Sequence, residues 1–145
     1  MGADRGGACE RVELTPTART LDWLREQGYR AGIVERWNPH GGVRIDLFGC
    51  LDVVAVNDTT TVGVQATSAG HVSDRVTKIR GEARDGALAW LMSPHRELWV
   101  VGWRKYAKPE DGRWWRPVVR EVTLEDLGGE DEEATQGTAD AESVG

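Results

Sequence analysis

The sequence predicts an α+β fold in which helices pack against a central mixed sheet. The first observation is a pair of apolar, β-branched runs, Gly49–Val56 and Thr61–Thr67, separated by four polar residues, 57–60, that favour a turn. The second is helical periodicity before and after these strands, followed by two further strand-like runs. The expected element order is helix, three strands, helix, two strands, written αβββαββ.

The first helix is predicted to begin at Thr15, whose side chain can cap it, with Pro16 at the first helical position. Leu21 and Leu24 form an apolar stripe, and Gly28 favours a C-terminal end. We therefore expect a short amphipathic helix just before the strands.

A strand is predicted over Tyr29–Trp37, followed by turn residues 38–42 and a second extended run, Val43–Phe48. These two runs are expected to form a hairpin. The hairpin of Gly49–Val56 and Thr61–Thr67 follows directly along the chain.

The second helix is predicted from about Ser73, and its inward positions are apolar: Val72, Val76, Ile79 and Ala83. Gly86 is expected to interrupt this helix. Ala87–Met92 continues with helical, apolar character, and Ser93-Pro94 ends it.

Two final strands are predicted over Glu97–Tyr106 and Arg113–Leu124, and Pro117 places the second of them at a sheet edge. Three tryptophans within apolar runs are expected to fill the core: Trp90, Trp99 and Trp103. Residues 1–14 and 128–145 lack sustained periodicity and are predicted to be disordered, which leaves a single domain over 15–127.

The register of the central hairpin follows from its four-residue loop. Val56 should face Thr61, and the pairing should continue until Asp52 faces Gln65. Strand period two then predicts one face with polar groups: Cys50, Asp52, Val54, Gly63, Gln65 and Thr67. The other face is wholly apolar and is expected in the core: Leu51, Val53, Ala55, Val62, Val64 and Ala66. An acid and an amide are thus predicted side by side on the wetter face.

The net charge of −6 is unevenly distributed over the 145 residues. Six acids lie in the last 18 residues, and without them the 18 remaining acids balance the 18 basic residues. Val72–Arg120 carries eleven basic and six acidic residues, which fits a polyanion partner and equally fits ordinary solvated surface. Cys9 and Cys50 have no metal-ligand spacing, and no signal peptide or long apolar run is present. A cytoplasmic protein without membrane contact is expected.

The segment Arg44–Asp52 (RIDLFGCLD), followed by Gln65–Ser68 (QATS), resembles the PD-(D/E)XK nuclease superfamily, and more closely small nuclease-like proteins of phages and bacteria. The similarity covers roughly Leu21 to Arg120, although outside the core it is one of element order alone. It implies a restriction-endonuclease-like core, Mg²⁺ or Mn²⁺ as cofactor, and Asp52 as the metal-binding aspartate. Gln65 stands where the family usually has Asp or Glu, and Thr67 where it usually has Lys.

These departures weaken the expected site, because Gln65 brings no negative charge to a cation and Thr67 cannot provide a positive one. Glu35 or Asp46 could restore a second carboxylate. The predicted metal ligands are Asp52, Glu35 and Gln65, and the predicted catalytic residues are these three with Asp46 and Lys78. The predicted nucleic-acid contacts are Arg75, Lys78, His71, Arg113 and Arg116.

Each of these residues also has a structural interpretation. Asp52 could cap a turn, Gln65 could be a satisfied polar residue of the sheet, and Glu35 could face solvent. Asp46 could pair with Arg44 or another arginine. A solvated helix face would explain Arg75 and Lys78 equally well, and His71 could be an ordinary loop residue.

Trp114 and Trp115 stand between Arg113 and Arg116, and adjacent strand residues face opposite sides of a sheet. One indole must therefore point outward or toward a partner. Such a side chain suits base stacking in single-stranded nucleic acid, and it suits a homodimer interface more often.

The first functional hypothesis is a metal-dependent nucleic-acid phosphodiesterase, endonuclease-like, with DNA favoured over RNA. The second keeps the fold without catalysis, as a module that binds nucleic acid or a protein partner. The third is an interaction protein in which the Trp-rich strands form an oligomer.

Overall fold

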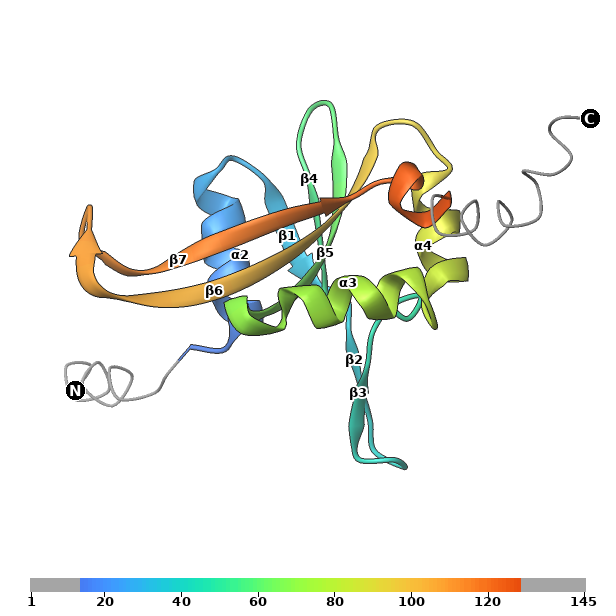
Figure 1. Cartoon of the computed structure of the whole chain (residues 1–145), viewed down its shortest axis with the longest axis horizontal. Coiled ribbons are helices and arrows are strands. Elements are labelled where there is room, and N and C mark those ends of the chain that lie inside the picture. Colours follow the sequence, from blue (N-terminus) through green and yellow to red (C-terminus); the bar gives the residue numbers. More distant parts are fainter. Residues whose placement is uncertain (1–13, 129–145) are drawn as a thin grey trace, which may run out of the picture.

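A five-stranded mixed sheet lies at the centre of the computed structural model, which describes residues 14–128 (Figure 1). Its strands are β1 (Arg30–Ile33), β4 (Val53–Val56), β5 (Thr61–Ser68), β6 (Arg96–Glu110) and β7 (Arg113–Val122). Their order is β1-β4-β5-β6-β7, with β5 and β6 parallel and every other neighbouring pair antiparallel. The predicted α+β class with a mixed sheet and packed helices is confirmed.

Helix α2 (Pro16–Glu26) covers one face of the sheet. The hydroxyl of Thr15 accepts a hydrogen bond of 3.1 Å from the amide of Ala18, as the predicted cap requires, and Gly28 follows with a φ of 95°. Leu24 packs on one side of the strands with Val53, Ala55, Val62, Val64, Val101 and Trp103. Complete burial of a leucine side chain stabilises a fold by roughly 2 kcal/mol, so this layer anchors α2 firmly.

The opposite face is covered by helices α3 (Val72–Arg80) and α4 (Arg84–Leu91), which connect the parallel strands β5 and β6 after the short helix η1 (Ala69–His71). Their inward side chains form a second core with the strands: Val76, Ile79, Ala87, Trp90, Leu91, Leu98 and Val100. The face of β5 that was predicted to be wetter is therefore buried, because a helical layer lies over it. Gln65 and Thr67 are only 2% and 5% exposed.

The break between α3 and α4 lies at residues 81–83, and the prediction of a break at Gly86 is wrong. The amide of Gly81 bonds the carbonyl groups of Thr77 and Lys78 and ends α3. Gly86 lies inside α4, where its backbone contacts the turn at Phe48 so closely that an added Cβ would overlap the Phe48 carbonyl oxygen. This glycine supports close packing of the helix on a turn, and it does not end the helix.

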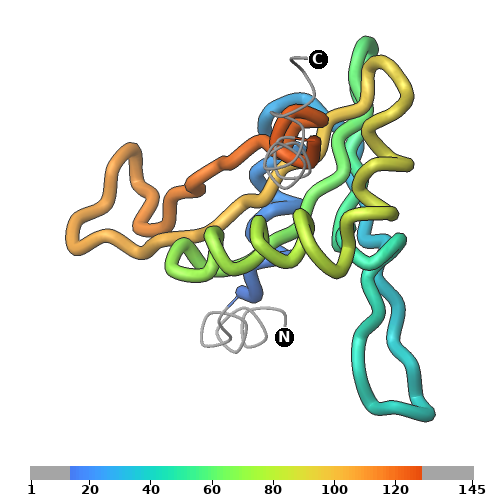
Figure 2. Tube along the Cα trace, turned by 45° about the vertical axis from the view of Figure 1, so that its right-hand side comes forward, coloured from blue at the N-terminus to red at the C-terminus, as the bar shows by residue number. Residues whose placement is uncertain are grey.

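The predicted strand over Tyr29–Trp37 is divided into β1 and β2 (Arg36–Asn38). The division occurs at Val34 and Glu35, whose backbone amides both point at the carbonyl oxygen of Asp52, at 2.9 and 3.4 Å. Strand β2 pairs with β3 (Val43–Ile45) as a separate two-stranded hairpin that projects from the body of the protein (Figures 1 and 2). The expected run Val43–Phe48 thus ends as a strand at Ile45. The predicted order αβββαββ is therefore wrong: within residues 14–128 five strands precede α3, because the first predicted strand is divided, and two helices lie between β5 and β6.

The central hairpin has the predicted register, with Val56 opposite Thr61 and Val53 opposite Val64. Strand β4, however, begins at Val53 and not at Gly49, because the preceding residues form a turn. Leu51 consequently packs with Trp90 on the α4 side of the sheet, opposite to the predicted face.

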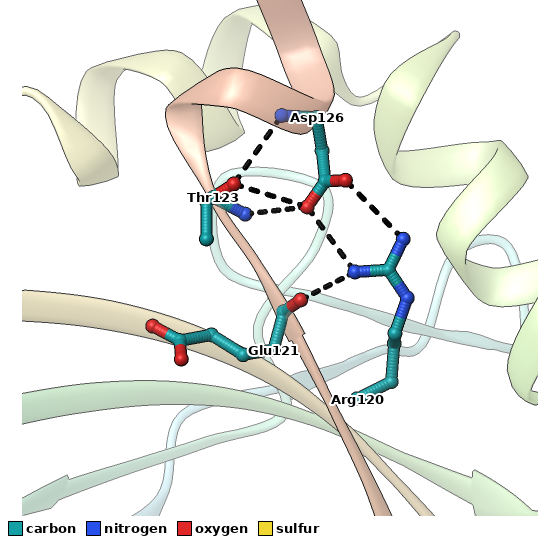
Figure 3. A network of polar contacts seen from close by, with 4 residues as sticks. All are labelled: Arg120, Glu121, Thr123 and Asp126. Atoms are coloured by element: carbon teal, nitrogen blue, oxygen red, sulfur yellow. Dashed lines mark hydrogen bonds and ion pairs between the residues drawn. The ribbon is translucent and has the colours of Figure 1, made fainter.

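The last two strands form a long hairpin in which β6 runs on to Glu110, beyond its predicted end, and β7 is an edge strand as Pro117 predicts. Strand β7 ends at Val122. There the Arg120 guanidinium bonds the Asp126 carboxylate, which also accepts hydrogen bonds from the Thr123 amide and hydroxyl (Figure 3). The chain is thereby turned back onto the α4 side, where Leu127 is buried.

Among residues 14–128, no helix has the length and apolar character that a membrane crossing requires. The disordered segments predicted over 1–14 and 128–145 fall, except for Leu14 and Gly128, outside the described residues.

Candidate metal and phosphate site

Three carboxylates converge where the projecting hairpin meets the central sheet. Glu35 lies between β1 and β2, Asp46 follows β3, and Asp52 precedes β4. One oxygen atom from each lies within 4.8 Å of the other two, a spacing at which the three could share one metal ion. The division of the first strand positions Glu35 here, because its amide is directed at the backbone of Asp52.

Asp52 is 6% exposed and accepts a hydrogen bond of 2.9 Å from the backbone amide of Ala66 on β5. Burial, and next the hydrogen bond with the Asp46 carboxyl, raise the pKa of Asp52 from 3.8 to about 8, although the Ala66 amide opposes this change. Without a cation, burial and the neighbouring Asp46 carboxyl therefore favour the protonated form of Asp52. The alternative that Asp52 merely caps a turn does not describe this environment.

Gln65 has one satisfied and one unsatisfied amide atom. Its Nε2 donates a hydrogen bond of 2.8 Å to Oδ2 of Asp46. Its Oε1 is buried and has no hydrogen-bond partner among the described residues. A buried amide oxygen without a hydrogen-bond partner lowers the stability of a folded protein by about 1–3 kcal/mol. Oε1 of Gln65 is therefore available to accept a hydrogen bond or to coordinate a cation.

Basic side chains border the carboxylates. Nζ of Lys78 lies 3.7 Å from Oδ2 of Asp46, and the Arg44 guanidinium lies 3.3 Å from Oε2 of Glu35. Asp46 therefore pairs with Lys78 and not with Arg44, contrary to the structural alternative considered from the sequence. Glu35, whose side chain is 11% exposed, does not face open solvent. Arg75 on α3 has a buried Nε without a hydrogen-bond partner among the described residues.

These groups line one cavity of about 490 Å³. Its polar lining consists of Thr15, Thr17, Glu35, Arg44, Asp46, Asp52, Gln65, Arg75 and Lys78. Acids and bases thus meet in a recess large enough for a nucleotide-sized ligand, with the first turn of α2 on one side and α3 on the other.

Arg44 and the Thr17 hydroxyl were not predicted as members of this site. Arg44 could have been found from its spacing, since residues 44 and 46 share a face of an extended segment. Thr17 had no such signal, because its position depends on how α2 packs against strands that are far away in the sequence.

The remaining predicted residues lie elsewhere. His71 is exposed in η1, and its Nδ1 lies 2.8 Å from the Ser68 hydroxyl. Arg113 pairs with Glu26 at 2.8 Å and Arg116 with Glu110 at 2.6 Å, and none of these side chains lines the cavity.

One of the paired tryptophans of β7 is exposed, as predicted, although both residues line one cavity together with Trp23 and Trp103. Trp114 is 47% exposed, whereas Trp115 is half-buried with the Arg19 guanidinium 4.0 Å above its ring. The outward indole belongs to a surface separate from the carboxylate cluster.

Comparison of the chain with protein-family models, with characterised proteins and with solved structures found no match.

Proposed function

We propose that the protein is a metal-dependent phosphodiesterase that acts on nucleic acid, with DNA preferred to RNA. The observation that carries the proposal is the buried Oε1 of Gln65, which has no hydrogen-bond partner within residues 14–128 although the amide is held at a cluster of three carboxylates. A cluster of acids alone is common on protein surfaces. An amide oxygen left without a donor in the same recess is not, and a hard cation would satisfy it.

The donor set fits Mg²⁺ or Mn²⁺. These ions prefer oxygen ligands, and Mg²⁺ typically takes one or two carboxylates and keeps several waters and substrate phosphate oxygens. Asp52, Glu35 and Gln65 would hold the ion, and Asp46 lies close enough to take part. When bound, such an ion supplies a water of lowered pKa and neutralises charge on the phosphodiester.

The chain's own residues would position the substrate. Lys78, Arg75 and Arg44 present positive charge at the cavity, where they can bind phosphate oxygens and stabilise the charge that develops during in-line displacement. Lys78 on α3 would thus take the place of the cationic residue that Thr67 cannot provide. The Ala66 amide fixes the orientation of the Asp52 carboxyl.

A module that binds nucleic acid without catalysis is the second candidate. The observation in its favour is that Lys78 and Arg44 already pair with Asp46 and Glu35, so that much of the acidic charge is compensated without a metal ion. Two positive side chains beside the carboxylates lower the affinity of the site for a cation.

The test is cleavage of supercoiled plasmid and of single-stranded DNA by the purified full chain in Mg²⁺, in Mn²⁺ and in EDTA. Metal-dependent cleavage that is lost in Asp52→Ala and retained in Asp58→Ala, an exposed turn aspartate, would support the phosphodiesterase. Salt-dependent DNA binding without cleavage would favour the binding module. Cleavage that survives Asp52→Ala would place the activity elsewhere and end the proposal.

A further inference from the structure

The hairpin of β2 and β3, residues 36–45, projects from the protein and is here called the arm (Figures 1 and 2). Within the part of the chain that the structure describes, its strands pair only with each other. The turn at its tip is held by the Asn38 side chain, which accepts a hydrogen bond of 3.0 Å from the His40 amide, and by the Gly42 amide, which bonds the Asn38 carbonyl at 2.8 Å. The arm therefore has a defined shape without a core beneath it.

Large apolar side chains of the arm remain uncovered. Trp37 is 56% exposed and Val43 is 52% exposed. A two-stranded hairpin gains little stability from its own contacts, so exposed apolar groups on it do not serve the arm's own fold. Single exposed apolar residues are normal on protein surfaces, so the charge and the position of the arm must identify its partner.

The charge of the arm indicates what that partner is. Residues 36–45 contain Arg36, His40 and Arg44 and no acid. The nearest acids, Glu35 and Asp46, stand at its two ends, and both belong to the carboxylate cluster. The arm carries positive charge and begins at the proposed catalytic site. It is therefore complementary in charge to a polyanion whose reacting phosphate lies in that site.

The face of the arm that continues the cavity can be identified from its register. Trp37 lies directly opposite Arg44, and side chains opposite each other share a face. Glu35 precedes Trp37 by two residues along the chain and pairs with Arg44. Because Glu35 and Arg44 line the cavity, the exposed indole of Trp37 lies on the same side, farther out along the arm.

The dimensions of the arm favour one form of nucleic acid. From Glu35 to the end of β2 at Asn38 the extended strand spans roughly 10 Å, at about 3.3 Å per residue, and the turn of residues 39–42 lies beyond it. The major groove of B-form DNA, about 12 Å wide and about 8.5 Å deep, admits a two-stranded ribbon. The major groove of A-form RNA is too narrow for side chains to enter.

We infer that the arm docks in the major groove of double-stranded DNA next to the phosphodiester held at the carboxylate cluster. Trp37 contacts the apolar edges of bases in the groove, and Arg44 contacts a phosphate at its wall. This inference rests on the proposed function for the position of the phosphodiester, and it adds that the substrate is a B-form duplex.

The test measures binding separately from cleavage. Fluorescence anisotropy is recorded for the full chain in EDTA with a labelled DNA duplex, the corresponding single strand and an RNA duplex of the same sequence. We expect the DNA duplex to bind most tightly. Trp37→Ala should weaken duplex binding by about tenfold, as truncation of a tryptophan at the centre of an interface does. Trp37→Phe should restore most of it.

The matched control is Trp114→Ala, because Trp114 is an exposed strand tryptophan outside the cavity. Its affinity for the duplex should stay within about twofold of the unaltered protein. Thermal melting of all three variants establishes that they are folded. Equal affinity for RNA and DNA duplexes, stronger binding of the single strand, or equal effects of Trp37→Ala and Trp114→Ala would overturn the inference.

The two proposals fail in different ways. If the protein binds DNA duplexes through Trp37 but never cleaves them, the phosphodiesterase proposal fails and the arm remains a DNA-binding element. If the protein cleaves DNA with unchanged KM and unchanged duplex affinity in Trp37→Ala, the arm proposal fails and the catalytic site remains.

Discussion

Nζ of Lys78 lies 3.7 Å from Oδ2 of Asp46, the same oxygen that accepts the hydrogen bond from Nε2 of Gln65. A helix, a strand and the segment after the hairpin thus meet at one atom. Oδ2 of Asp46 thus contacts one ammonium group and accepts one amide hydrogen bond. Oε2 of Glu35 contacts Arg44 and Oδ2 of Asp52 accepts the Ala66 amide, so a cation would bind mainly the second oxygen of each of these carboxylates. Gln65 lines the same cavity, and its Oε1 has no hydrogen-bond partner among the described residues.

Replacement of Lys78 should affect metal binding and cleavage in opposite directions. Lys78→Met removes a like charge next to the proposed cation, so Mn²⁺ affinity should rise by about fivefold, while loss of phosphate stabilisation should lower kcat by about 100-fold. Lys108→Met, an exposed lysine of β6, is the control and should change neither quantity. Calorimetric Mn²⁺ titration and single-turnover cleavage would measure both. Weaker Mn²⁺ binding in Lys78→Met would contradict the assigned role.

The stability of the metal-free protein should fall as pH rises from about 4 to about 8. In this window folded Asp52, with its pKa of about 8, retains a proton that the unfolded chain, with its pKa of 3.8, has released. Asp52→Asn should abolish this dependence and raise the free energy of unfolding at pH 8 by a few kcal/mol, on the order of the shift. Urea denaturation in EDTA at pH 5, 7 and 9 provides the measurement. Identical slopes in both proteins would refute the assignment.

Metal binding should release a proton. Because a carboxyl group must ionise to ligate a cation, affinity for Mg²⁺ or Mn²⁺ should rise by about tenfold per pH unit up to the Asp52 pKa of about 8 and then level off. Calorimetry at pH 7 in two buffers of different ionisation enthalpy counts the protons released, and about one is expected. No proton should be released on any residual binding to Asp52→Asn.

Substitution of Gln65 separates its two amide atoms. Gln65→Glu adds a negative ligand and should tighten Mn²⁺ binding by about tenfold, but it removes the donor to Asp46, so the metal-free protein should lose about 1–3 kcal/mol of stability. Gln65→Leu should weaken metal binding instead. Titration calorimetry together with melting in EDTA would measure these effects. If Gln65→Leu binds Mn²⁺ as tightly as the unaltered protein, Oε1 is not a ligand.

Gly86→Ala should destabilise the fold by about 1–3 kcal/mol, because the new methyl group meets the rigid backbone of Phe48 and α4 must shift. Gly32→Ala is the matched control, since a Cβ at that strand position meets no atom within 4 Å among the described residues. Chemical denaturation of both variants checks the difference. Equal stability of the two would mean that α4 adjusts freely on the Phe48 turn.

Local chemistry was sufficient to predict the pairing of the central hairpin. The loop between Val56 and Thr61 sets the register, which ends with Val53 opposite Val64, and Asp52 next to that pair accepts the Ala66 amide. Asp52 and Gln65 line the same cavity, but the predicted strand pairing does not extend to them. The start of α2 was also predictable, because the Thr15 cap involves only neighbouring residues.

The burial of that pair was not predictable from the same residues. Its cover is α3 and α4, which cross over the sheet between β5 and β6 and bring Trp90 against Gly63. The position of Glu35 likewise depends on hydrogen bonds to the Asp52 backbone, which no local pattern encodes. Long-range packing therefore decides which acids meet, whereas sequence periodicity decides only which strands exist. The relationship to PD-(D/E)XK nucleases remains a prediction.

The positions of Glu35 and Asp46 at the two ends of the hairpin have a thermodynamic consequence. An ion bound by both carboxylates would connect the two strands at their base and restrict the motion of the hairpin tip. Ion and duplex would then favour the same restricted state, so each must raise the affinity of the other by an identical factor. Metal and DNA would then bind cooperatively, because the two carboxylates flank the hairpin in the sequence.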